Sequence, residues 1–135
     1  MKSLVSAVND FLESINFVAP WLIRLGLGIA FIIHGLSKFP LPPEGLMNYF
    51  DFSPILASFV AVSELGAGIF IIFGGLIKSK IGDQITRFAA LVIVVIMIFA
   101  FAIAHQDWFI TTKLFTSEQI FLLLIGLYFI LKGNN

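Results

Sequence analysis

Four titratable side chains lie near the same end of three apolar stretches of the chain: His34, Lys38, His105 and Glu118. Imidazole and ammonium groups donate hydrogen bonds to carbonyl or oxyanion oxygens, and a carboxylate can take up or release a proton. His34 and Lys38 are four residues apart, so a helix would place them on one face. The pattern predicts a polar pocket in which both histidines and Lys38 bind a small ligand, while Glu118 relays protons to the surface.

A second group consists of Arg24, Glu64 and Arg87, which lie within or beside apolar stretches. An ionised side chain at the centre of a membrane helix costs about 2.5 to 3.5 kcal/mol, so it usually faces other helices and has a partner. At a helix rise of about 1.5 Å per residue, Glu64 falls near the midplane and both guanidinium groups can reach it. We therefore expect one ion-pair group. Two roles stay open for it: a pin that fixes helix register, or a functional role in which Glu64 carries protons or binds a polar group of a substrate.

The same residues disfavour a resident metal or haem. The two histidines are offset in depth by about 6 Å from helix rise, which does not suit two axial ligands of one iron. Metal ligands at the close spacing of catalytic sites are lacking as well, so no metal-binding residue is assigned. The chain has no cysteine, which excludes thiol redox chemistry and thiolate ligation of iron–sulfur clusters. A quinone is the redox cofactor or ligand that these residues leave open.

The composition places these groups in a membrane. Of 135 residues, 59% are hydrophobic and only 12% are charged, unlike a soluble domain. Blocks that can cross a hydrocarbon core of about 30 Å as helices are expected at residues 19–37, 54–77, 85–105 and 117–132. The blocks lack the alternation of barrel strands, so the expected fold class is all-α, a transmembrane four-helix bundle. A net charge of zero without a basic tract excludes nucleic-acid binding.

Residues 1–17 are expected to form a unit of their own, ahead of a membrane domain over residues 18–135. An apolar helix face lies opposite Asn9, Asp10 and Glu13, which predicts an amphipathic interfacial helix on the membrane surface. Lysine and arginine are more numerous near the N-terminus, the 78–87 loop and the C-terminus than in the two remaining loops. Both termini are therefore expected to be cytoplasmic.

Glycines recur at a spacing of seven residues within two spans: Gly28 with Gly35, and Gly68 with Gly75. Small residues on one stripe let neighbouring backbones approach closely, which is how helices associate in lipid. The spacing predicts helix packing at these four positions. The small-residue stripes are also compatible with a homo-oligomer, whose order they do not specify.

Taken together, the polar and glycine positions resemble the DoxX family of small four-span bacterial membrane proteins. The similar segments are RLGLGIAFIIHGLSKF, SELGAGIFIIFGGL, TRFAA, AHQDWF and SEQIFLLLIGLYFIL, which cover most of residues 20–132. The stretch KSKIGDQI before Thr86 departs from the resemblance, because it is longer than the expected connection between the second and third spans. The resemblance implies a location in the bacterial inner membrane. It also implies a relation to subunits of thiosulfate:quinone oxidoreductases and other membrane redox complexes.

The leading hypothesis is a ligand-binding subunit of a membrane redox system, with a quinone or a sulfur oxyanion as ligand. The chain carries no self-sufficient catalytic motif, so catalysis would require a redox partner protein. One alternative is a non-catalytic structural or assembly subunit. Another is a small proton-coupled transporter, which the single carboxylate near the midplane and the lack of an internal repeat disfavour.

Overall fold

The computed structural model describes residues 3–104 and 113–135, and every regular element in these ranges is a helix. Helices α2, α4 and α5 are each long and apolar enough to cross a membrane. The elements are α1 (Leu4–Ser14), α2 (Val18–Leu36), α3 (Glu44–Phe50), α4 (Pro54–Leu76), α5 (Lys80–Ile103), α6 (Lys113–Thr116) and α7 (Glu118–Lys132).

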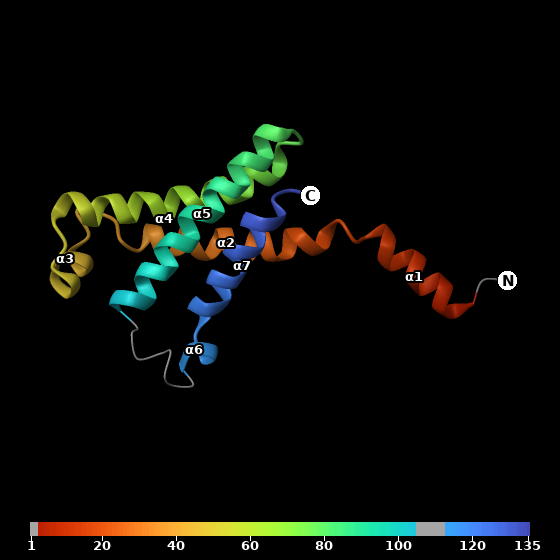
Figure 1. Ribbon diagram of the computed structural model, residues 1–135, viewed down its shortest axis with the longest axis horizontal. Coiled ribbons are helices and arrows are strands. Elements are labelled where there is room, and N and C mark those ends of the chain that lie inside the picture. Colours follow the sequence, from red (N-terminus) through yellow and green to blue (C-terminus); the bar gives the residue numbers. More distant parts are fainter. Residues whose placement is uncertain (1–2, 105–112) are drawn as a thin grey trace.

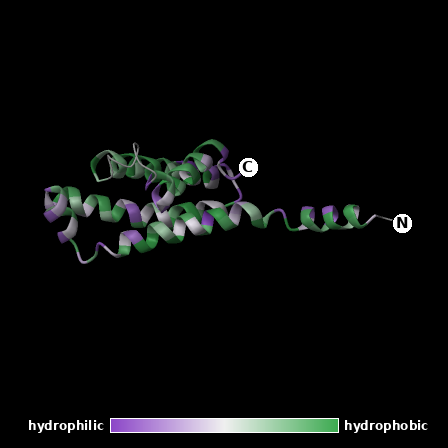
Figure 2. Ribbon diagram, turned by 90° about the horizontal axis from the view of Figure 1, so that it is seen from below, coloured by the Kyte–Doolittle hydropathy of each residue, from purple (hydrophilic) through white to green (hydrophobic). Residues whose placement is uncertain are grey.

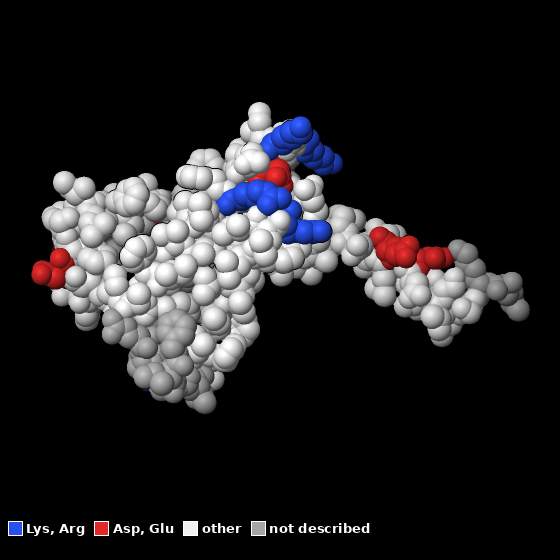
Figure 3. Space-filling view, in the orientation of Figure 1, with Lys and Arg blue, Asp and Glu red and all other residues white. Residues whose placement is uncertain are grey.

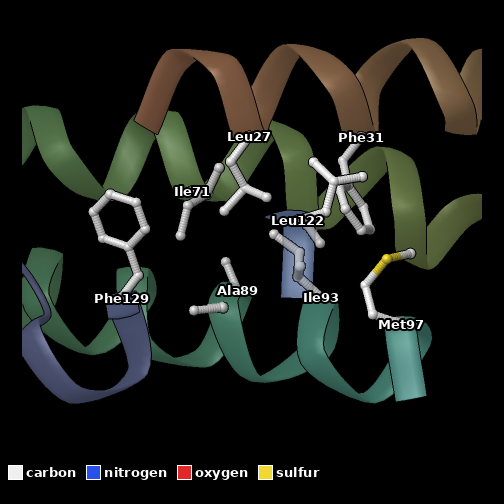
Figure 4. Close-up of a cluster of buried hydrophobic side chains, with 10 residues drawn as sticks. Leu27, Phe31, Ile71, Ala89, Ile93, Met97, Leu122 and Phe129 are labelled. Carbon is white, nitrogen blue, oxygen red and sulfur yellow. The ribbon is translucent and has the colours of Figure 1, made fainter. Parts of the chain in front are cut away.

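The long helices pack in sequence, α2 against α4, α4 against α5 and α5 against α7, and α7 also touches α2 (Figure 1). Their buried side chains meet between the four helices, as Figure 4 shows. The largest fully buried side chains are Phe31, Phe101 and Phe129. Apolar residues also cover most of the outer faces of α4 and α5 (Figure 2). Helices that are hydrophobic all round are typical of a lipid environment.

Helix α1 extends away from the packed helices (Figures 1 and 2). The Ser3 hydroxyl caps its start by accepting a hydrogen bond from the Ser6 backbone N–H at 3.1 Å. None of its residues is buried, and Leu4 and Phe11 are among its exposed apolar side chains. The position of this helix at a membrane surface remains a prediction.

The first two expected spans agree with α2 and α4 to within one residue, whereas the third begins earlier than expected. Helix α5 starts at Lys80, so most of the segment predicted as the 78–87 loop is helical. Only residues 77–79 connect α4 to α5. Ser79 occupies the N-cap position in extended backbone, and Asp83 adds negative charge in the first turn, which favours a helix start here. The KSKIGDQI stretch is thus mainly the first turns of α5.

The fourth expected span corresponds to α7, which has 15 residues. At about 1.5 Å per residue its length is roughly 22 Å, shorter than a hydrocarbon core of about 30 Å. The short helix α6 precedes it, separated by Ser117. Helix α7 packs on α5 and buries Ile120, Leu122, Gly126 and Phe129. A four-span arrangement therefore remains a prediction.

Helices α2 and α4 approach each other closely at glycines. A Cβ atom at Gly35 would lie 2.6 Å from the backbone nitrogen of Leu65, and one at Gly68 would lie 2.8 Å from that of Ile32. A Cβ at Gly28 would lie 3.0 Å from the carbonyl oxygen of Gly68. Three of the four glycines singled out by their spacing thus lie at this helix contact. Because the obstructing atoms are backbone, a side chain there would force the helices apart.

The fourth of these glycines, Gly75, has a different neighbour. A Cβ atom there would lie 2.6 Å from Nε of Arg24, so the missing side chain leaves room for a guanidinium group.

Replacement of Gly35 by alanine should destabilise the protein, because the added methyl group would collide with the α4 backbone. We expect a loss of about 1 to 3 kcal/mol in the free energy of unfolding, measured by denaturant titration in detergent micelles. Gly26→Ala on the same helix is the matched control, because a Cβ there meets nothing within 4 Å. Equal unfolding of the two variants would contradict a close helix contact at Gly35.

Candidate functional site

Arg24 is the centre of a polar cluster formed by α2, α4, α5 and the residues after α7. We call Arg24, Asp83, Thr86, Arg87 and Asn134 the Arg24 cluster. Arg24 is only 4% exposed, and its Nη1 atom donates hydrogen bonds to the carbonyl oxygen of Ile71 at 2.6 Å and to Oγ1 of Thr86 at 3.0 Å. Its guanidinium carbon lies 4.6 Å from the ring centroid of Phe129, a cation–π contact.

Asn134 connects the members of this cluster. Its Oδ1 atom accepts hydrogen bonds from Nη2 of Arg24 at 2.8 Å and from Oγ1 of Thr86 at 2.7 Å. Its Nδ2 atom donates to the carbonyl oxygen of Gly74 at 2.8 Å. The preceding Gly133 has a φ of 60°, a conformation that glycine adopts readily, and this turn directs Asn134 back toward α4 and α5.

Arg87 and Asp83 complete the cluster. Nε of Arg87 lies 2.9 Å from Oδ2 of Asp83, one turn earlier on α5. Nη1 of Arg87 donates to the carbonyl oxygens of Ile130 and Leu131, at 2.6 and 3.1 Å. Oδ1 of Asp83 accepts a hydrogen bond from the backbone N–H of Asn134 at 2.8 Å. Arg87 thus binds carbonyl groups in the last turn of α7, which lack partners within that helix.

Glu64 belongs to a different group from the one expected. Its Oε2 atom lies 2.6 Å from Nζ of Lys38, and the side chain is 9% exposed. Arg24 and Arg87 take the partners described above, so the structure does not bring Glu64 into one ion-pair group with them. The reason is the helix register: Gly35 lies against Leu65, which sets Glu64 level with the last turn of α2. The depth estimate had counted residues from the start of each span and took no account of this displacement of α4 along α2.

Lys38 links Glu64 to the end of α2. Its Nζ atom also donates a hydrogen bond to the carbonyl oxygen of His34 at 3.2 Å. Nε2 of His34 lies 3.0 Å from Oε1 of Glu118 at the start of α7, and both of these side chains are exposed. We call His34, Lys38, Glu64 and Glu118 the Lys38 cluster. The structure therefore brings together three of the four predicted ligand-binding residues, and His105 lies outside the described residues.

An apolar cleft of about 670 Å³ lies between α4 and α5 and ends at Lys38 and Glu64. Figure 1 shows these two helices meeting at their short connection and diverging toward α3. The aromatic side chains that line the cleft are Phe50, Phe52, Phe59 and Phe99. Apart from the ion pair, Ser63 is the polar side chain of its lining among the described residues. Ligand sites commonly combine such a volume and apolar lining with a few convergent polar groups.

Sequence reasoning had missed part of this arrangement. The spacing of four residues between Asp83 and Arg87 is a recognisable helix pair. Nothing in the sequence pointed to Asn134, whose role depends on the turn at Gly133 and on three neighbouring helices. The cleft was missed because its lining comes from α3, α4 and α5 together. The described residues contain no group of His, Asp and Glu side chains that could hold a metal ion.

The Arg24 cluster predicts that replacing two adjacent asparagines, Asn134 and Asn135, will lower the free energy of unfolding by unequal amounts. Asn134→Ala should remove three side-chain hydrogen bonds and leave Arg24 short of an acceptor, lowering the free energy of unfolding by about 1 to 3 kcal/mol. Asn135→Ala, at an exposed position, should have little effect. Thermal unfolding of both variants in the same detergent measures the difference. Identical unfolding temperatures would show that Asn134 does not hold the helices together.

The family comparison covers the part of the chain that contains most of these groups. Residues 19–106 match the model of the family described as DoxX. No curated protein and no solved structure matches the chain. The matched segment includes α2, α3, α4 and α5, and with them the cleft and its ion pair. Since the match extends over more than half of the 135 residues, the chain belongs to the DoxX family of membrane proteins.

Proposed function

We propose that this protein binds an isoprenoid quinone in the cleft between α4 and α5, as the ligand-binding subunit of a membrane redox system. The observation that carries the proposal is an apolar cleft of about 670 Å³ whose described lining contains one ion pair, in which Glu64 is 9% and Lys38 20% exposed. A quinone has the matching distribution of polarity, with carbonyl oxygens on a ring and an apolar tail. Its tail would continue into lipid along the exposed apolar faces of the two helices.

Between the two ligand classes that the sequence leaves open, the cleft favours a quinone over a sulfur oxyanion. A small dianion such as thiosulfate needs several converging donors or cations to replace its hydration. Here the one cation, Lys38, already faces the carboxylate of Glu64 at 2.6 Å, and the remaining lining of the described cleft is mostly apolar. A neutral ring with carbonyl groups requires far less compensation.

Each polar residue at the end of the cleft has a distinct proposed role. Lys38 donates a hydrogen bond to a carbonyl oxygen of the ring, and Glu64 accepts one from a hydroxyl of the reduced ring. The carbonyl of His34 holds the ammonium group from the other side. The exposed pair of His34 and Glu118 lies where it can exchange protons with water. The Arg24 cluster, with its many internal hydrogen bonds, holds the opposite ends of the helices.

Filling the cleft should weaken quinone binding without disturbing the polar pair. Val95 lines the cleft from α5, so Val95→Trp should weaken binding of a ubiquinone analogue with a decyl tail by about tenfold or more. Calorimetric titration in nanodiscs of quinone-free lipid measures this affinity. Ile98→Trp is the matched control, because Ile98 is an exposed residue of the same helix outside the cleft lining. Equal affinities of the two variants would exclude this cleft as the site.

A non-catalytic assembly subunit is the competing function, and the same titration separates the two. If the parent protein binds no quinone analogue at concentrations that saturate known quinone sites, the proposed function is wrong. A stable protein partner recovered from native membranes would then favour an assembly role. The Arg24 cluster is compatible with either function, because it serves the packing of the helices.

We also propose an orientation in the bacterial inner membrane, with four spans, α1 on the membrane surface and both termini in the cytoplasm. Figure 3 shows lysine and arginine side chains gathered at the end of the molecule where α4 turns into α5. Basic residues are enriched on the cytoplasmic side of membrane proteins. Acidic side chains lie on α1, near α3 and also among these basic side chains, where Asp83 pairs with Arg87. The end with α3 and the mouth of the cleft would therefore face outward.

The lack of cysteine makes this orientation simple to test. Single cysteines can replace Glu44 and Lys78, which are both exposed. Glu44 lies in α3, before the start of α4, and Lys78 lies after the end of α4. In intact spheroplasts, a membrane-impermeant maleimide should label Glu44→Cys and should label Lys78→Cys only after the membrane is opened. The reverse pattern would mean that the protein is inserted the other way round.

A further inference from the structure

The charges in the cleft between α4 and α5 cancel each other. Lys38 and Glu64 are the charged residues of its lining in the described part of the chain, and their side chains are 20% and 9% exposed. The contact of 2.6 Å between Nζ and Oε2 lies at the end of a lining that is otherwise almost entirely apolar. The ligand therefore meets a strong local dipole with no net charge.

The absence of net charge in the cleft matters because a membrane also contains anionic amphiphiles that could compete with a quinone. Fatty acids and anionic lipids carry the same kind of apolar tail as a quinone, but they end in a carboxylate or phosphate. A lone lysine at the end of an apolar cleft would attract such anionic heads strongly, since charge pairs are poorly screened away from water. With Glu64 in contact, an approaching carboxylate meets a second carboxylate at nearly the same distance, and like charges at short range repel.

The hydrogen-bonding capacity of Lys38 supports the same conclusion. An ammonium group has three N–H donors. Nζ donates a hydrogen bond to the carbonyl oxygen of His34 at 3.2 Å, and it lies 2.6 Å from Oε2 of Glu64, which accepts no hydrogen bond from the described residues. With Glu64 beside it, the ammonium group keeps donor capacity for one ligand oxygen, which is enough for a carbonyl or hydroxyl group. A carboxylate head, which has two charged oxygens to satisfy, would have to displace Glu64.

We infer that Glu64 is a specificity-determining residue, which keeps anionic amphiphiles out of the cleft and reserves it for molecules with a neutral polar head. The inference rests on the proposed function, in that it takes the cleft as the ligand site. It goes further by assigning Glu64 to discrimination between ligands, through its effect on the charge of Lys38. Removing the carboxylate charge should convert the cleft into a site for fatty-acid anions.

The first test uses the parent protein in nanodiscs, with laurate and dodecanol as competitors of the decyl ubiquinone analogue. These two competitors share a chain length and differ in the charge of the head at a pH at which laurate is ionised. Dodecanol should displace the analogue at a concentration at least about tenfold lower than laurate. Laurate competing as well as dodecanol would overturn the inference, and this result does not depend on any variant folding.

The second test reverses the selectivity. In Glu64→Gln an acceptor oxygen of similar size stays beside Lys38, but the charge of Lys38 is no longer cancelled. We expect the affinity for laurate to rise by about tenfold or more relative to the affinity for the quinone analogue. The double variant Lys38→Gln with Glu64→Gln is the matched control, because its pair is neutral again and should bind laurate no better than the parent.

The outcomes separate this inference from the proposed function. If the parent binds the quinone analogue but Glu64→Gln and the double variant bind laurate equally, the specificity role of Glu64 is wrong and the site stands. If the parent binds neither the analogue nor dodecanol, both the site and the inference are wrong. If Glu64→Gln does not fold, the competition in the parent protein decides the matter.

Discussion

The register of α2 against α4 is the constraint on which the rest of the structure depends. Glycines allow these two backbones to approach within van der Waals contact, and a Cβ at Gly35 would already collide with Leu65. This contact sets Arg24 beside the carbonyl oxygen of Ile71 at one end and Lys38 beside Glu64 at the other. Both polar clusters thus have contacts across the same helix pair. A shift of α4 by one turn would separate Glu64 from Lys38 and the carbonyl oxygen of Ile71 from Arg24.

The two clusters differ in how completely their polar groups are satisfied. In the Arg24 cluster, buried donors and acceptors find partners within the protein, and the side chain of Asn134 alone bonds to Arg24 on α2, Thr86 on α5 and the carbonyl oxygen of Gly74 on α4. Such a network fits a structural role, because removing any member leaves buried groups unpaired. In the Lys38 cluster, the buried Oε2 atom of Glu64 accepts no hydrogen bond from the described residues, and its neighbour at the end of the cleft is the ammonium group of Lys38 at 2.6 Å. A group of this kind can accept a ligand without breaking the fold.

Much of the helical organisation could be predicted from the sequence, because long apolar blocks between polar residues have few other interpretations in a chain of this composition. The partner of Glu64 could not be predicted from the sequence, because it depends on how far α4 is displaced along α2. Residue counts within each helix carry no information about that displacement. The contacts of Asn134 could not be predicted for a similar reason, because they depend on a turn that brings this residue against other helices. The start of α5 was misjudged because the polar stretch with Lys78, Lys80 and Gly82 is typical of a loop. Ser79 and Asp83 nevertheless favour a helix start there.

The neutral pair also explains how a charged lysine can lie at the end of an otherwise apolar cleft. A lysine inside an apolar environment is costly unless a carboxylate shares its burial, and the pair together needs less compensation than either charge alone. A site built only from uncharged groups would bind carbonyl oxygens weakly, since hydrogen bonds from ionised donors are roughly twice as strong as neutral ones. A site with an unpaired cation would collect anionic lipids. The pairing of Lys38 with Glu64 combines a strong donor with no net charge, which is what recognition of a neutral ligand within a lipid membrane requires.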